Sequence, residues 1–124
     1  PGVNEKKVGT AKLGEGPILH CGPTYNPQLL ETVQKTAKAV KIKTQMQPEG
    51  RGSGTDAYAM RMTRSGVPSA LFSVPLRYMH SPGETLCLKD VEATAQLIAE
   101  TIMALTGKET WGRRTLKRKP APKA

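Results

Sequence analysis

The residues best suited to chemistry are a histidine and a glutamate in the second half of the chain. His80 follows a short apolar run, and Glu84 comes four residues later. Open α/β sheets bind their ligands beyond the carboxyl ends of the strands, which is where this histidine would lie. Its imidazole could bind a metal ion, and the carboxylate could orient the ring or bind the ion itself. A lone loop histidine is more often structural, so both roles stay open on this pattern.

A second candidate is the glycine-rich loop that leads into Gly54, Thr55 and Asp56. Such a loop could present backbone N–H groups and a carboxylate to a substrate. A flexible turn followed by a helix cap explains the same residues and is the favoured interpretation. The loop matches neither a P-loop nor a dinucleotide fingerprint. No serine stands in a Gly-x-Ser-x-Gly context, so nothing local indicates a serine hydrolase.

Basic residues gather at the C-terminal end. The formal net charge is +9, and residues 107–124 hold seven lysines and arginines against one glutamate, which leaves +6 there and +3 elsewhere. A flexible tail of this kind could bind RNA, DNA or anionic lipid heads by charge, although a solvated tail with nonspecific affinity is the favoured alternative. Trp111 could stack on a base, but packing against the last helix is favoured. The candidate anion-binding residues are Arg113, Arg114, Lys117, Arg118 and Lys119.

The elements that must position these residues alternate along the chain. Strands are expected at 17–21, 42–47 and 70–74, with a helix after each. The β-α-β-α-β-α order predicts an α/β sheet covered by helices. Residues 70–74 are apolar on both faces, which is typical of a central strand.

The three helices have recognisable ends. Asn26 with Pro27 should cap the first helix, and Thr55 or Asp56 a second one that runs to Thr63. The last helix is expected to begin with Asp90 as its cap and to end at Gly107. Its expected buried stripe consists of Val91, Ala95, Ile98, Ile102 and Leu105.

Length and cysteine content limit the class of protein. A chain of 124 residues fits one domain, and no apolar run approaches the roughly 18 residues of a membrane span. Cys21 and Cys87 are far apart and indicate buried thiols in a reducing, cytoplasmic compartment. No signal-peptide pattern opens the chain. Because it begins on Pro1, either an initiator methionine was removed or the sequence comes from something longer.

Four motifs follow one another along the chain: Gly54-Thr55-Asp56-Ala57, Thr63-Arg64-Ser65-Gly66-Val67-Pro68, Pro75-Leu76-Arg77-Tyr78-Met79-His80-Ser81 and Leu88-Lys89-Asp90-Val91-Glu92. In their order and spacing they resemble a known family. This family is the dinuclear-metal aminopeptidases, metallopeptidase family forty-two, which includes tetrahedral and glutamyl aminopeptidases and endoglucanase M-like proteins. The resemblance covers about residues 1–106 as the C-terminal part of a catalytic domain, with 107–124 as a tail outside it.

The resemblance implies half of a zinc-exopeptidase-type sheet and a cytoplasmic enzyme that removes N-terminal residues from peptides. Two metal ions, zinc or cobalt, would activate a water while a glutamate acts as base. His80 matches the family's final metal ligand. The other ligands, the base and a dimerisation insert lie before the equivalent of Pro1. Gly54, Thr55, Asp56 and Glu84 receive a substrate-pocket or supporting role.

This chain alone falls short of such a centre. A catalytic zinc needs about three protein ligands, and a two-metal site also needs bridging carboxylates. The first hypothesis is a catalytic-domain part that needs the missing part, or a homo-oligomer, for activity. The second is a non-catalytic relative whose tail binds nucleic acid or another anionic partner. The third is a mononuclear site built from His80 and Glu84 with His20 or Asp56.

Overall fold

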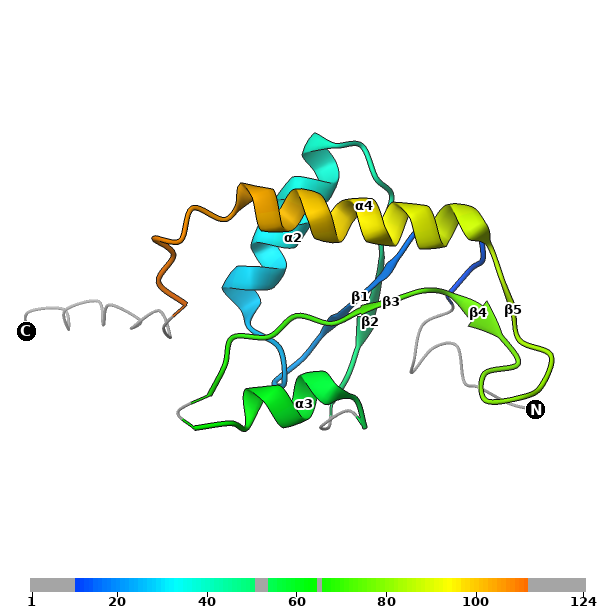
Figure 1. Cartoon of the computed structure of the whole chain (residues 1–124), viewed down its shortest axis with the longest axis horizontal. Coiled ribbons are helices and arrows are strands. Elements are labelled where there is room, and N and C mark those ends of the chain that lie inside the picture. Colours follow the sequence, from blue (N-terminus) through cyan, green and yellow to red (C-terminus); the bar gives the residue numbers. More distant parts are fainter. Residues whose placement is uncertain (1–10, 51–53, 65, 112–124) are drawn as a thin grey trace, which may run out of the picture.

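The computed structural model describes residues 11–50, 54–64 and 66–111 (Figure 1). The described part of the chain forms a three-stranded sheet, a two-stranded sheet and three helices. In chain order the elements are β1 (Ile18–Cys21), α2 (Pro27–Ala39), β2 (Gln45–Pro48), α3 (Asp56–Arg61), β3 (Phe72–Ser73), β4 (Leu76–Arg77), β5 (Thr85–Leu86) and α4 (Leu88–Ala104).

The central strand of the three-stranded sheet is β1. It pairs in parallel with β2 and antiparallel with β3, so the strand order is β2-β1-β3. The prediction that residues 70–74 form the central strand is therefore wrong. Only Phe72 and Ser73 pair, and they do so at an edge, where both are half-buried. The apolar run reflects the packing of Phe72 against the core rather than coverage of both faces.

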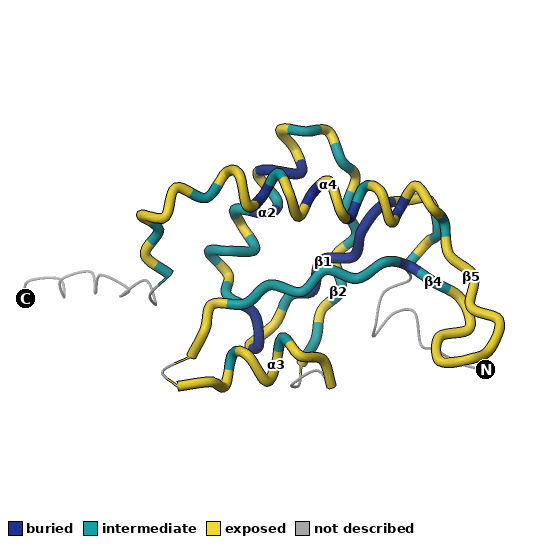
Figure 2. Tube along the Cα trace, viewed as in Figure 1, coloured by how far each residue is buried: buried dark blue, intermediate teal, exposed yellow. Residues whose placement is uncertain are grey.

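Helix α2 begins as predicted. Asn26 Oδ1 accepts hydrogen bonds from the backbone N–H groups of Gln28 and Leu29, both at 3.0 Å, and Pro27 occupies the first helical position. Val33 and Ala37 on its inner side pack with Leu19 of β1 and Leu97 of α4 to form the hydrophobic core (Figure 2).

Helix α4 differs from the prediction in its first residue and in which of its sides is buried. Cys87 occupies its N-cap position, and Asp90 lies inside the first turn rather than capping the helix. The Asp90 carboxylate is 1% exposed and accepts hydrogen bonds from the backbone N–H groups of Gly14 at 2.7 Å and Gly16 at 2.9 Å. The Asp90 side chain thus anchors the N-terminal loop to α4. Because this contact points into the protein, it determines which side of α4 is buried.

The predicted buried stripe of α4 is wrong for the same reason. Val91, Ala95, Ile98 and Ile102 are exposed, and Leu105 is half-buried beyond the end of the helix at Ala104. The side that packs toward α2 instead carries Asp90, Thr94, Leu97 and Thr101.

The segment between the sheet and α4 is more regular than expected. The sequence predicts no strand between residue 74 and the last helix, yet β4 and β5 form an antiparallel hairpin in which Leu76 pairs with Leu86 and Arg77 with Thr85. Two other boundaries shift: β2 starts later than the predicted strand at 42–47, and α3 ends at Arg61, before Thr63.

Two further predictions concerned membrane spans and the burial of the cysteines. In the described ranges, no helix is long and apolar enough to cross a membrane. Cys21 and Cys87 are both free thiols and are half-buried rather than fully buried. Of the tail predicted at 107–124, residues 112–124, which include its predicted anion-binding residues, lie outside the described residues.

Candidate functional site

His80 lies in the turn that joins β4 to β5. The turn is held by a hydrogen bond from the backbone N–H of Ser81 to Tyr78 O at 3.0 Å. Tyr78 and His80 both adopt the left-handed conformation, with φ of 59° and 62°. This conformation is uncommon outside glycine and persists only where surrounding contacts hold it.

Glu84 is one of those contacts. Its Oε1 atom accepts a hydrogen bond from the backbone N–H of His80 at 2.6 Å. Glu84 therefore lies close to His80, but its carboxylate contacts the backbone and not the imidazole that it was expected to orient. Among the described residues, no hydrogen bond or ion pair involves the His80 ring, and the residue is exposed. The ring is thus accessible to an ion or a ligand.

The second predicted group lies on another element. Gly54, Thr55 and Asp56 are exposed at the start of α3, with Thr55 at the N-cap position. Figure 1 shows α3 below the three-stranded sheet and the β4–β5 hairpin to the right of it. Residues 51–53 of the glycine-rich loop lie outside the described residues. The contacts of the described residues do not join these two groups into one site.

A metal ion has few ligands in this chain. Within the described ranges, no three histidine, cysteine, aspartate or glutamate side chains come together. The proposed mononuclear site is not assembled, because His20 lies within the sheet and its ring nitrogens face other partners. The metal-binding side chains of the described residues therefore do not suffice for a dinuclear centre. Among them, His80 supplies an accessible imidazole.

A buried polar network around His20 is a feature that the sequence did not reveal. His20 Nδ1 lies 3.0 Å from Glu49 Oε1, and Nε2 lies 2.9 Å from Ser73 Oγ. The Tyr25 hydroxyl donates to the other oxygen of Glu49. His20 and Tyr25 are buried, so the network links β1, the residue after β2, and β3 inside the protein. Only the placement of His20 in a predicted strand hinted at it.

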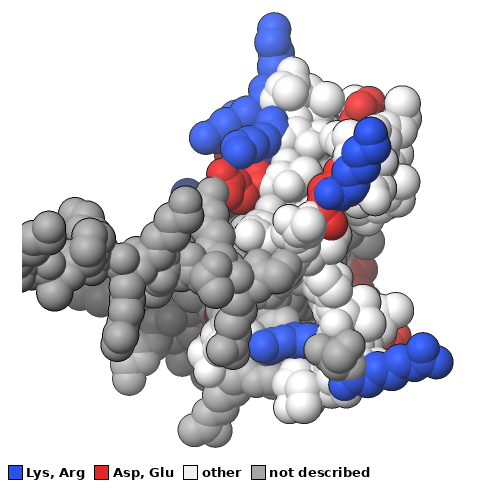
Figure 3. Space-filling view, turned by 90° about the vertical axis from the view of Figure 1, so that its left-hand side faces the viewer, with Lys and Arg blue, Asp and Glu red and all other residues white. Residues whose placement is uncertain are grey.

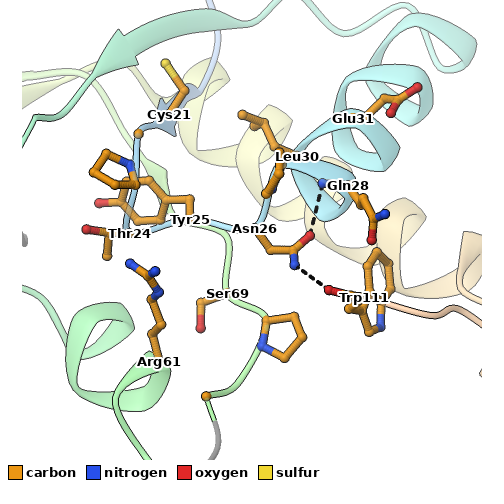
Figure 4. Close-up of a pocket in the computed structure, with 15 residues that line it drawn as sticks. Cys21, Thr24, Tyr25, Asn26, Gln28, Leu30, Glu31, Arg61, Ser69 and Trp111 are labelled. Carbon is orange, nitrogen blue, oxygen red and sulfur yellow. Dashed lines mark hydrogen bonds between the residues drawn. The ribbon is translucent and has the colours of Figure 1, made fainter. Parts of the chain in front are cut away.

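A pocket of about 690 Å³ opens beside the start of α2. Asn26, which caps α2, also donates from Nδ2 to the backbone oxygen of Trp111 at 3.0 Å (Figure 4). The Trp111 backbone therefore lies beside the start of α2, and packing of its side chain against the last helix stays a prediction. Arg61 extends from α3 toward Thr24 on the opposite wall (Figure 4).

Figure 3 shows how the charged side chains of the described residues are distributed on one face of the molecule. The lysine and arginine side chains of the described residues are spread over that face, and acidic side chains lie next to several of them. Among the described residues, Lys35 pairs with Glu31 at 2.9 Å and Lys43 with Glu15 at 3.5 Å. The tail candidates Arg113, Arg114, Lys117, Arg118 and Lys119 lie outside the described residues.

Comparison with known proteins gives consistent matches. The family model for M42 glutamyl aminopeptidases matches residues 1–97. Lysyl aminopeptidase of Pyrococcus furiosus is 40% identical over 94 residues, which cover 76% of this chain and 27% of that protein. A putative aminopeptidase of Acetivibrio thermocellus is 31% identical over 94 residues, covering 73% of this chain and 28% of that protein.

Solved structures agree with these matches. The TET aminopeptidase of a marine sediment thaumarchaeote is similar with a TM-score of 0.70 and 37% identity, over 76% of this chain and 27% of that one. The Pyrococcus horikoshii TET1 peptidase, described as assembling into a tetrahedron or a large octahedral shell, gives a TM-score of 0.59 and 31% identity, over 78% of this chain and 28% of that one.

These matches agree in coverage as well as in kind. The chain spans a little over a quarter of the length of each relative. Sequence and structure point to the same group of aminopeptidases, and the family model spans most of the chain. The chain therefore belongs to the M42 glutamyl aminopeptidase family.

Proposed function

We propose that this chain forms the C-terminal part of a metal-dependent aminopeptidase catalytic domain, to which it contributes His80 as a metal ligand. The observation that carries the proposal is the position of His80. Its ring is accessible at the turn of the β4–β5 hairpin, while its backbone is held by Glu84. A ligand that must meet donors from another part of a domain needs this combination of an open side chain and a fixed backbone.

Glu84 would position His80 rather than bind the ion. Metal-binding histidines depend on nearby groups that orient them. Here the carboxylate holds the backbone N–H of His80 at 2.6 Å and supports the left-handed turn. In the same proposal, Gly54, Thr55 and Asp56 line the substrate side of the completed site.

The metal ions would be held mainly by the rest of the domain. The donors of the described residues do not form a two-metal site, so no step of hydrolysis is assigned to a residue of this chain. We infer that the chain alone is inactive, and that zinc or cobalt binds once the missing part is present. Peptide substrates, assembly into larger shells and a cytoplasmic location belong to the same proposal.

A chimaeric enzyme tests this function. The chain replaces the matching segment of Pyrococcus furiosus lysyl aminopeptidase, and release of nitroaniline from lysine p-nitroanilide is measured with zinc or cobalt. His80→Ala is expected to lower both bound metal and turnover, and Glu84→Ala to lower turnover on the order of 10-fold. Lys35→Ala, on the surface of α2, is the control and should change neither.

Two results would contradict the proposal. One is a His80→Ala chimaera that keeps its full metal content and rate. The other is stoichiometric zinc with turnover by the 124-residue chain alone, which would require a complete site within it.

The basic tail carries a separate proposal, nucleic-acid binding by a non-catalytic relative. Its support is the charge of the tail, with seven lysines and arginines against one glutamate in residues 107–124. RNA binding by the full chain should weaken on removal of residues 108–124 and fall steeply with salt. Binding that persists unchanged after this truncation would eliminate the tail as the cause.

A further inference from the structure

Helix α4 packs toward α2 with a largely polar side. The buried residues on this side are Asp90, Thr94, Leu97 and Thr101, of which only Leu97 is apolar. Each polar group has a partner. Asp90 accepts from Gly14 and Gly16, Thr94 Oγ1 donates to Asp90 O at 2.6 Å, and Thr101 Oγ1 donates to Leu97 O at 2.7 Å. The two threonine bonds lie within the helix, so its rotation is set by the Asp90 bonds to Gly14 and Gly16 and by the burial of Leu97.

The strongly apolar side of α4 faces outward. Its residues recur at intervals of three and four, which places them on one helix face. Leu88 is 74% exposed, Ile102 63%, Ile98 38% and Val91 37%, and Ala95 is exposed as well. We call this face the α4 stripe, and it consists of Leu88, Val91, Ala95, Ile98 and Ile102.

The helix also has a separate face suited to water. Lys89, Glu92 and Gln96 are exposed beside the α4 stripe and carry charge or an amide. One buried side and one polar side are enough for a helix on the surface of a protein, so an additional exposed apolar side is unexpected. Contiguous exposed apolar surface of this kind marks an interface.

We propose that the remainder of an M42 catalytic domain covers the α4 stripe. This inference rests on the proposed function, because the same part of the domain would complete the metal site. Two observations favour this occupant. The chain spans only 27% of its lysyl aminopeptidase relative, so most of such a domain lies in polypeptide outside the matched segment. The family match runs to residue 97, so Leu88, Val91 and Ala95 belong to the family fold and not to the basic tail.

Cysteine accessibility in two proteins tests the inference. Ile98→Cys and Gln96→Cys are made in the 124-residue chain and in the chimaera described above. Labelling by a maleimide is followed by peptide mass, so that Cys21 and Cys87 are read separately. In the chain alone, both new thiols should label at similar rates. In the chimaera, the thiol at position 98 should label at least roughly 10-fold more slowly than in the chain alone. The labelling rate of the thiol at position 96 should be the same in both proteins.

Ile102→Cys provides a second probe if the change at position 98 impairs folding. Equal labelling at positions 96, 98 and 102 in the chimaera would overturn the inference. Protection of positions 98 and 102 in the chain alone, together with a dimeric mass in solution, would show that a second copy covers the α4 stripe and would also overturn it.

Failure of this inference is distinguishable from failure of the proposed function. A chimaera that hydrolyses lysine p-nitroanilide while its α4 stripe labels freely would contradict only the interface. An inactive chimaera with a protected stripe would support the interface and contradict the proposed function.

Discussion

His20 Nδ1 lies 3.0 Å from Glu49 Oε1, and this contact joins the central strand to the residue that follows β2. On its other side, His20 Nε2 lies 2.9 Å from Ser73 Oγ in β3. Glu49 precedes the glycine-rich loop that leads to Thr55, and Ser73 precedes the hairpin that carries His80. The network therefore fixes the starting points of both segments that carry candidate site residues.

Replacing His20 should destabilise the protein more than replacing one of its partners. His20→Ala leaves Glu49 and Ser73 without this partner inside the protein, at a cost of about 2–4 kcal/mol in the free energy of unfolding. Ser73→Ala leaves only the Nε2 atom of His20 without its partner, at a cost of about 1–2 kcal/mol. Urea unfolding of the full chain measures both values. Equal losses in the two variants would show that His20 contributes nothing beyond the bond to Ser73.

Asp90 is expected to be a major stabilising residue although it caps no helix. Asp90→Ala removes the acceptor of two backbone N–H groups, those of Gly14 and Gly16, and should cost about 2–4 kcal/mol of unfolding free energy. Asp90→Asn retains one acceptor oxygen and should cost less. Lys89→Ala, an exposed neighbour on the same helix, is the control and should stay within about 0.5 kcal/mol. A similar loss for Lys89→Ala would show that the loss is not specific to the Asp90 carboxylate.

Two nearby glycines allow a matched test of backbone packing. Both have positive φ, 80° at Gly14 and 86° at Gly16, so alanine is strained at either position by about 1–2 kcal/mol. At Gly16 a Cβ atom would also lie 2.0 Å from Lys43 O, whereas nothing lies within 4 Å at Gly14. Gly16→Ala should therefore lower the thermal midpoint well beyond Gly14→Ala. Comparable shifts would contradict the close approach of the loop to Lys43.

The pKa of Glu109 should be below its ordinary value. Hydrogen bonds from Thr106, first from its backbone N–H at 2.6 Å and then from its hydroxyl at 2.8 Å, stabilise the carboxylate and lower this pKa. Because the folded pKa is the lower one, the carboxylate supports the turn above the unfolded pKa, and this support is lost as pH falls through the folded pKa.

An NMR titration of the full chain measures this pKa directly. Thr106→Val removes the hydroxyl but keeps the backbone N–H, so the pKa should rise part of the way toward the ordinary value. Trp111, the one tryptophan of the sequence, reports through its fluorescence on the same segment. A pKa that does not change in Thr106→Val would show that the hydroxyl does not contact the carboxylate in solution.

Local signals predicted the parts of the fold that depend on neighbours in sequence. Asn26 followed by Pro27 specifies the start of α2, because the cap bonds reach only two and three residues along the chain. The same holds for β1, where a short apolar run proved to be a buried strand. The proximity of Glu84 to His80 was also predictable from a spacing of four residues.

Long-range contacts account for the predictions that were wrong. Asp90 has the residue type and position of a helix cap, but its acceptors are used by glycines 76 and 74 residues away. That contact turns α4 so that Val91 and Ile98 face outward. Likewise, residues 70–74 have the composition of a central strand, although β1 occupies the centre of the sheet.

The sequence by itself determined the family, through motifs that include the segment around His80. It also determined the location of the helices. Both depend on residues that are close together in the sequence. The tertiary structure alone decided which face of α4 is buried, which strand is central, and that His20 joins Glu49 to Ser73. These features depend on groups brought together from distant positions, where a satisfied buried hydrogen bond outweighs local preference. The tertiary structure also decided that His80 lies in an open turn while its backbone is held by Glu84, because that arrangement requires the β4–β5 hairpin to form.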